Sequence, residues 1–77
     1  MDELLKRITM DPKVMVGKPV IKGTRITVEH IMRHLAAGWT EAELLDAHPH
    51  LTPDDIRAAC AYAADRVAGD RVLAVAE

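Results

Sequence analysis

The sequence predicts a mainly α-helical domain in which a short N-terminal β-ribbon precedes a core of three helices. Thr27, Thr40 and Thr52 each stand at a helix N-cap position ahead of apolar residues with helical spacing. Before them, two short β-prone runs flank a turn signal at Lys22-Gly23. We therefore divide the 77 residues of a single domain into a ribbon or arm over 1–26, a three-helix core over 27–68 and a C-terminal tail over 69–77.

The first 26 residues are expected to form short strands. Asp11-Pro12 is a turn signal that separates β-prone runs at Ile8 and at Val14-Met15-Val16. Residues 19–21 and 24–28 then flank Lys22-Gly23, where glycine supplies the positive φ of a tight turn. This spacing predicts a β-hairpin between residues 19–21 and 24–28.

The first two helices are predicted from their start and stop signals. Thr27 begins a helix of about ten residues that ends before Gly38, where a left-handed residue is needed. Thr40 and Glu43 form a capping-box pattern for a short second helix, which His48-Pro49 terminates. Trp39 is expected to fill the core at the corner between the two helices.

The third helix has the clearest start signal. Thr52 is followed by a proline at the first helical position and by two carboxylates at the positive end of the helix dipole. Gly69 is expected to end this helix. Its buried stripe is predicted to comprise Ile56, Ala59, Cys60, Ala63, Ala64 and Val67.

The small size of the chain predicts a homodimer. A domain of this length buries only about 60% of its unfolded surface, and a single cysteine, Cys60, cannot form an internal disulfide. Oligomerisation is the remaining way to add apolar burial. We expect no membrane association and a cytoplasmic location, because the sequence has neither a membrane-spanning apolar run nor a leader at Met1. The residues expected to be covered by the second chain are Val14, Val16, Val72, Leu73 and Val75.

The charge distribution predicts two different partners. Residues 1–39 hold seven Lys and Arg against four Asp and Glu, a balance of +3, whereas residues 40–77 hold three against eight, a balance of −5. The basic half suits a polyanion such as DNA, and the acidic half suits a cationic protein. The alternative for the basic half is an ordinary solvated ribbon whose lysines discourage edge pairing. The cations expected to contact DNA in the ribbon and first helix are Lys18, Lys22, Arg25 and Arg33.

Three capped helices with short connections also match a helix-turn-helix, in which the third helix enters the major groove. Thr52 and Arg57 are the candidate DNA contacts at its start. Asp54 and Asp55 oppose this arrangement, because carboxylates repel phosphate. We therefore expect the ribbon to supply much of the attraction to DNA.

Catalytic and metal chemistry has little support in the sequence. His30 and His34 lie four residues apart, a spacing that can place two imidazoles on one metal ion, but no third ligand is identifiable and solvent-facing histidines are expected. His48 and His50 bracket a proline, where they could reach a phosphate or simply end the short helix. No nucleophile–base arrangement is suggested by spacing, so we predict no catalytic residue, no metal and no cofactor.

The run GKPVIKGTRITVEHIMRHLAAGW and the pattern His48-Pro49-His50-Leu51-Thr52 resemble the prokaryotic family catalogued as domain of unknown function 433, from about Ile8 to Asp65. The resemblance implies a homeodomain-like or winged helix-turn-helix fold. It also implies an antitoxin that neutralises a PIN-like ribonuclease toxin encoded beside it and binds its own promoter DNA. It assigns no catalytic residue.

The expected function is therefore a dimeric DNA-binding antitoxin of a type II toxin-antitoxin pair. The alternative is an adaptor or assembly module that binds a protein and no DNA, and a small metal-dependent enzyme is the third possibility considered. The acidic balance and the apolar C-terminal segment supply the expected toxin contacts, which are Asp54, Asp55, Asp65, Val72, Leu73 and Val75.

Overall fold

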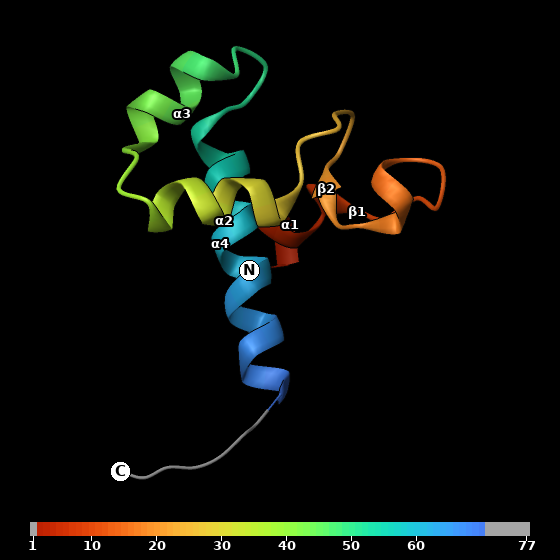
Figure 1. The fold of residues 1–77 in the computed structure, drawn as a ribbon. Coiled ribbons are helices and arrows are strands. Elements are labelled where there is room, and N and C mark those ends of the chain that lie inside the picture. The colour runs from red at the N-terminus through yellow and green to blue at the C-terminus, as the bar shows by residue number, and fades with distance from the viewer. Residues whose placement is uncertain (1, 71–77) are drawn as a thin grey trace, which may run out of the picture.

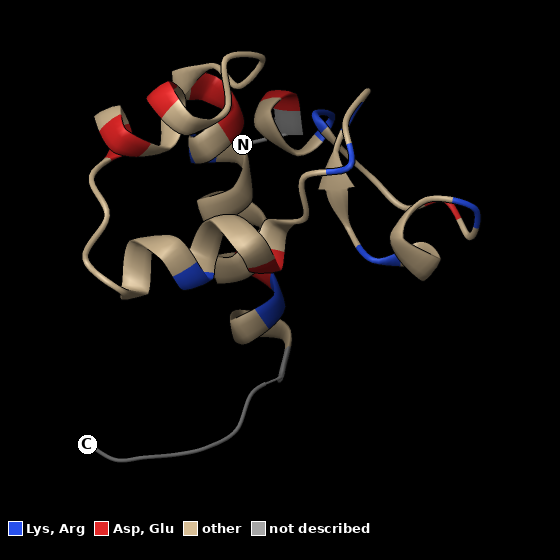
Figure 2. Ribbon diagram, turned by 45° about the horizontal axis from the view of Figure 1, so that its top comes forward, with Lys and Arg blue, Asp and Glu red and all other residues tan. Residues whose placement is uncertain are grey.

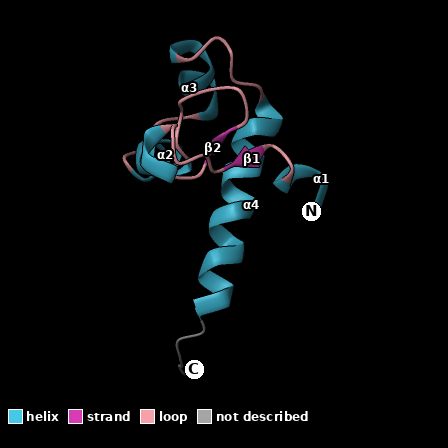
Figure 3. Cartoon of the chain, turned by 90° about the vertical axis from the view of Figure 1, so that its right-hand side faces the viewer, coloured by secondary structure: helices cyan, strands magenta, loops and turns pink. Residues whose placement is uncertain are grey.

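The computed structural model describes residues 2–70, which form a mainly helical chain with one small sheet (Figure 1). The prediction of a mainly α chain with a short N-terminal sheet is confirmed. The three core helices are α2, α3 and α4, and α4 extends well beyond the other elements (Figure 3). In chain order the elements are α1 (Asp2–Leu5), β1 (Ile8–Thr9), the 3-10 turn η1 (Met15–Gly17), β2 (Val20–Ile21), α2 (Val28–Ala36), α3 (Glu41–Ala47) and α4 (Pro53–Asp70).

The helix starts lie where the threonines predict them. The Thr27 hydroxyl accepts a hydrogen bond from the His30 amide at 2.9 Å and caps α2. Thr40 and Glu43 form the predicted capping box at the start of α3. Gly38 adopts a φ of +98° just after α2, as the stop signal requires. These features depend on contacts within four residues, so the local sequence is sufficient to specify them.

The predicted hairpin is present in short form, and β2 also has a second partner. The Ile21 amide donates to the Ile26 carbonyl at 2.9 Å and the Val28 amide to the Pro19 carbonyl at 2.9 Å, on either side of a bridge between Val20 and Thr27. The unpredicted partner is β1, which pairs with β2 in an antiparallel register that places Ile8 opposite Ile21. The tight turn itself is present, because the Thr24 amide and hydroxyl both donate to the Ile21 carbonyl and Gly23 has a φ of +81°. Thr27 begins α2, so too few residues remain after the turn to lengthen the hairpin.

The predicted strand at Val14–Val16 is also wrong. The Asp11 carboxylate accepts a hydrogen bond from the Lys13 amide, and the Asp11 carbonyl accepts one from the Val14 amide at 2.8 Å. This turn draws the backbone away from an extended path. Met15 and Val16 then take left-handed conformations with φ of 50° and 57°, which cost energy for residues with a Cβ.

The core lies where β2 and the three helices meet. Ile31 of α2 and Leu44 of α3 are fully buried, and burial of side chains of this size contributes about 1.5–3 kcal/mol each. Ile8, Leu35 and Tyr62 pack against the cluster from its edges. The buried residues of this cluster are Ile21, Val28, Ile31, Leu44, Leu51, Ile56 and Ala59.

The predicted buried stripe of α4 is only partly correct. Ile56 and Ala59 are buried as expected, but Cys60 is exposed. Ala64 and Val67 are also exposed, because they lie on the end of α4 that projects from the body (Figure 1). The buried face instead includes Asp55, Ala58 and Ala61, and Ala63 is half-buried.

Two smaller expectations are also corrected. α4 continues through Gly69 to Asp70 rather than ending at the glycine, which has no left-handed φ here. Trp39 does not fill the core. It is exposed, and its ring meets the His34 imidazole edge-on with the centroids 4.5 Å apart.

Candidate functional site

The turn between β2 and α2 displays two cations, Lys22 and Arg25. Neither forms an ion pair with an acidic side chain that the structure describes. Both side chains line an open groove of about 890 Å³. His50, from the connection between α3 and α4, lines the same groove, and Asp11 is its one acidic lining residue. A groove with two uncompensated cations can hold an anionic group such as a phosphate.

The other two ribbon and α2 cations are held by one acid. Glu29 on α2 binds Lys18 Nζ at 3.1 Å through Oε1 and Arg33 Nε at 2.9 Å through Oε2. The hydrogen bond from Lys18, followed by that from Arg33, holds the pKa of the Glu29 carboxyl below its usual value. Lys18 and Arg33 are therefore partly neutralised, unlike the pair in the turn.

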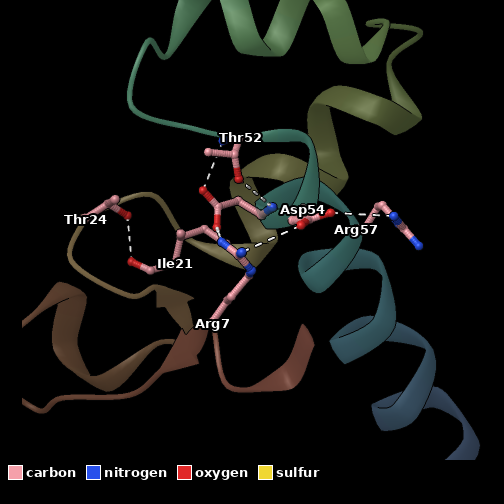
Figure 4. Close-up of polar contacts among 7 residues, drawn as sticks. Arg7, Ile21, Thr24, Thr52, Asp54 and Arg57 are labelled. Atoms are coloured by element: carbon pink, nitrogen blue, oxygen red, sulfur yellow. Dashed lines mark hydrogen bonds and ion pairs between the residues drawn. The ribbon is translucent and has the colours of Figure 1, made fainter. Parts of the chain in front are cut away.

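The first turn of α4 is tied to the N-terminal segment by Arg7. Its Nη1 donates to Asp55 Oδ1 at 3.0 Å, while Asp55 Oδ2 accepts from the Thr52 amide at 3.0 Å (Figure 4). The Thr52 hydroxyl in turn accepts from the Asp55 amide at 3.2 Å, so the two residues cap the helix reciprocally. The Asp55 side chain is only 9% exposed. Asp55 was expected to contact a partner, but its buried carboxylate is already engaged in holding the fold.

Asp54 lies between two arginines. Its carboxylate is 3.6 Å from Arg7 Nη2 and 3.5 Å from Arg57 Nη1, and its side chain is 52% exposed (Figure 4). The negative charge that opposed DNA binding at this helix start is therefore partly balanced. Arg57 is correspondingly engaged within its own helix, and the Thr52 hydroxyl is used as a cap.

The acidic half of the sequence also forms a distinct region in space. Asp and Glu gather on α3 and the first turn of α4, whereas the segment around the strands carries mainly Lys and Arg (Figure 2). Asp65 is exposed on the projecting end of α4, close in sequence to Val67, which is 71% exposed. The other three predicted toxin contacts, Val72, Leu73 and Val75, lie outside the described residues.

Three histidines cluster beside Trp39. His30 and His34 are half-buried, contrary to the expectation that they face solvent. His48 is also half-buried, and it caps the end of α3, one of the two roles considered for it. The His30 and His34 ring centroids are 4.1 Å apart with the planes inclined by 46°, and His34 Nδ1 contacts the His30 carbonyl at 2.8 Å. His30 Nε2 instead meets His48 Nε2 at 3.3 Å. No group of three or more His, Cys, Asp or Glu side chains with the arrangement of a metal site occurs within residues 2–70.

The sequence did not single out Arg7 or the pairing of His30 with His48. Arg7 and Asp55 are 48 residues apart, and His30 and His48 are 18 apart. Neither pair has a local spacing signal, because each contact forms only when distant segments of the chain pack together.

None of the helices that the structure describes combines the length and the apolar character needed to cross a membrane.

The fold and the groove together define a small, mainly helical domain with a cationic turn beside a three-helix core. The chain belongs to the family described as "Protein of unknown function (DUF433)", whose profile matches residues 8–63. The resemblance found in the sequence is thereby confirmed at the level of the family.

Solved and curated relatives agree with this assignment. The crystal structure of a DUF433 member protein from Anabaena variabilis ATCC 29413 superposes with a TM-score of 0.78 and 31% identity, covering 88% of this chain and 67% of that one. Uncharacterized protein y4eO of Sinorhizobium fredii is 38% identical over 56 residues, which are 73% of this chain and 25% of y4eO. This chain thus spans a quarter of that relative's length. An uncharacterized protein of Archaeoglobus fulgidus is 62% identical over 29 residues, which are 38% of this chain and 81% of that protein.

Proposed function

We propose that this protein is an antitoxin that binds the DNA of its own promoter through the Lys22–Arg25 turn and neutralises a PIN-like ribonuclease toxin. The observation that carries the DNA-binding part is the open groove lined by Lys22 and Arg25, whose charges no described acid compensates by an ion pair. Phosphate contacts of this kind provide affinity that does not depend on base sequence.

The contacts at the start of α4 support the proposal that the Lys22–Arg25 turn, rather than this helix, supplies the main attraction to DNA. Asp55 is buried against Arg7, and Asp54 keeps both Arg7 and Arg57 close to its carboxylate. A helix start with these internal ion pairs offers little net positive charge to a phosphate. In a helix-turn-helix formed by α2, α3 and α4, the turn after β2 would then act as the basic wing that contacts the backbone.

Fluorescence anisotropy with labelled promoter DNA tests this part of the proposal. The double variant K22A/R25A should bind more weakly at every salt concentration, and its log–log salt slope should fall by about 1.8, since each phosphate contact contributes about 0.9. K18A/R33A removes the same formal charge from side chains that Glu29 already pairs, so it should change the slope less. If the two double variants lose DNA affinity and salt slope equally, the total charge of the protein, and not the groove, controls binding.

Toxin neutralisation is supported by the exposed end of α4 in the acidic half of the chain. Val67 offers an uncovered apolar side chain there, and Asp65 is exposed close by. A ribonuclease must present cations to RNA, so an acidic partner with an apolar anchor can cover that surface. We place the described part of the toxin contact on this end of α4.

Co-purification with the product of the neighbouring reading frame tests the toxin contact. V67D should reduce capture and inhibition of that ribonuclease, because it places a charge in the apolar anchor. M10D is the matched control, since Met10 is also an exposed apolar residue but belongs to the N-terminal segment. Retained inhibition by V67D would remove this end of α4 from the interface. Capture of the partner without any salt-dependent DNA binding would favour the adaptor function instead.

A further inference from the structure

A pair of imidazoles joins α2 to the end of α3. His30 lies on α2, and His48 is the residue that caps the C-terminus of α3. Their Nε2 atoms are 3.3 Å apart, the ring centroids are 5.2 Å apart, and the ring planes are inclined by 78°. The two nitrogens that face each other are the atoms at the outer ends of the side chains.

These two distances match those of two histidines that share one tetrahedral ion. With metal–nitrogen bonds of about 2.0–2.1 Å, the tetrahedral angle places the two nitrogens about 3.3–3.4 Å apart and the ring centroids about 5.2 Å apart. The His30–His34 pair does not match, because its ring centroids are only 4.1 Å apart and His34 Nδ1 contacts a backbone carbonyl. The pair that can converge on an ion is therefore the one formed by packing, not the one spaced four apart on α2.

We propose that His30 and His48 together bind one divalent transition-metal ion, Zn²⁺, Ni²⁺ or Cu²⁺, through their Nε2 atoms, with water in the remaining coordination positions. Imidazole nitrogens suit these ions, whereas Mg²⁺ and Ca²⁺ prefer oxygen. Both imidazoles line a hollow of about 180 Å³, which has room for the ion and its waters.

Metal binding requires both imidazoles in the neutral form, with the lone pair of each Nε2 free to ligate the ion. In the metal-free protein the contact at 3.3 Å is a hydrogen bond when one of the two Nε2 atoms carries the ring proton; when the ion binds, that proton moves to Nδ1 of the same ring, so both Nε2 lone pairs face the ion.

Arg25 lines the same hollow and opposes the ion. Its guanidinium is always protonated, so its charge lowers the affinity for a dication. Removing this charge should therefore tighten metal binding, while removing either imidazole should weaken it. This opposite response distinguishes a site in the hollow from adventitious binding elsewhere on the surface.

Isothermal titration of the untagged full chain with ZnCl₂, NiCl₂ and CuCl₂ tests the proposal, with MgCl₂ as the negative control. One ion should bind per chain, tightest for Cu²⁺. H30Q and H48Q should each weaken binding at least about tenfold, because a single imidazole remains. H50Q is the matched control from the same connection, and its affinity should equal that of the wild type. R25A should bind more tightly than the wild type.

Nuclear magnetic resonance of the wild-type chain provides a second reading that needs no variant. Zn²⁺ should shift the ¹⁵N resonances of Nε2 in His30 and His48 and leave those of His50 in place. The proposal is overturned if binding is weaker than about 1 mM, if H48Q binds like the wild type, or if the Nε2 resonances of His30 and His48 do not respond.

Discussion

Replacement of Asp55 by alanine should be among the most destabilising substitutions at a charged position in this chain. The Asp55 carboxylate accepts from Arg7 Nη1 and from the Thr52 amide, both at 3.0 Å, and its side chain is 9% exposed. Hydrogen bonds to a charged group contribute about 1.5–3 kcal/mol each when they are buried. The Arg7 side chain is 42% exposed, so solvent screens its ion pair with Asp55. This ion pair therefore contributes about 1 kcal/mol or less to the free energy of unfolding, as exposed pairs do.

The sum gives a loss of about 1.5–4 kcal/mol in the free energy of unfolding for D55A. For a domain of this size such a loss lowers Tm by about 6–32 °C, because 1 kcal/mol corresponds to about 4–8 °C. Thermal and urea denaturation followed by circular dichroism measure both quantities.

D54A is the matched control for this experiment. Asp54 has the same charge one residue earlier, but its side chain is 52% exposed and its contacts are 3.5 and 3.6 Å long. Its removal should cost less than about 1 kcal/mol. A double-mutant cycle between R7A and D55A should show a coupling energy of at least about 0.5 kcal/mol. If D55A and D54A destabilise the chain equally, the anchoring role of the Arg7–Asp55 contact is refuted.

Three further predictions concern acid stability, assembly and the C-terminal segment. Burial lowers the pKa of His30 from its ordinary 6.5, so just below pH 6.5 the folded state binds fewer protons than the unfolded state. The free energy of unfolding should therefore be constant above pH 6.5 and fall as the pH decreases through the folded pKa. H30Q should flatten this part of a plot of urea midpoint against pH. Val16 is 91% exposed and has a left-handed backbone conformation, which asparagine tolerates. V16N should therefore shift the sedimentation of the protein from dimer towards monomer. A wild-type chain that is already monomeric at tens of micromolar, about the scale of a weak dimer, would contradict the dimer prediction. Deletion of residues 70–77 should leave the helical circular dichroism signal in place and abolish inhibition of the toxin, whereas full inhibition by the shortened chain would confine the contact to the described helices.

The parts of the fold that the sequence predicted correctly are those specified by near neighbours. Thr27 and the Thr40–Glu43 pair satisfy amide groups within three residues, so their hydrogen bonds follow from the helix geometry itself. Gly23 likewise adopts the positive φ that its turn requires.

The parts that the sequence missed depend on contacts between distant segments. Ile21 pairs with Ile8 of β1 as well as with Ile26 after the turn, and the pairing with β1 has no turn signal in the local sequence to indicate it. The buried face of α4 is set by what packs on it, so Cys60 is exposed although its spacing from Ile56 is helical.

The candidate site follows the same division. The sequence predicted Lys22, Arg25, Lys18 and Arg33 alike as DNA contacts, because all four lie in one basic stretch. The i,i+4 spacing of Glu29 and Arg33 on one helix could have indicated their ion pair, but only the folded chain shows that Glu29 also binds Lys18. Charge counts along a sequence therefore locate a cationic region but do not show which of its charges are compensated.

We propose that the Lys22–Arg25 turn is the part of this protein that contacts DNA. A titration of the ¹⁵N-labelled chain with its own promoter duplex, followed by amide chemical shifts, tests it most directly. The largest changes should fall on residues 22–25 and on His50, which line the same groove, and they should weaken as salt is raised. Changes confined to α3 and the projecting end of α4, with residues 22–25 unaffected at low salt, would contradict the claim.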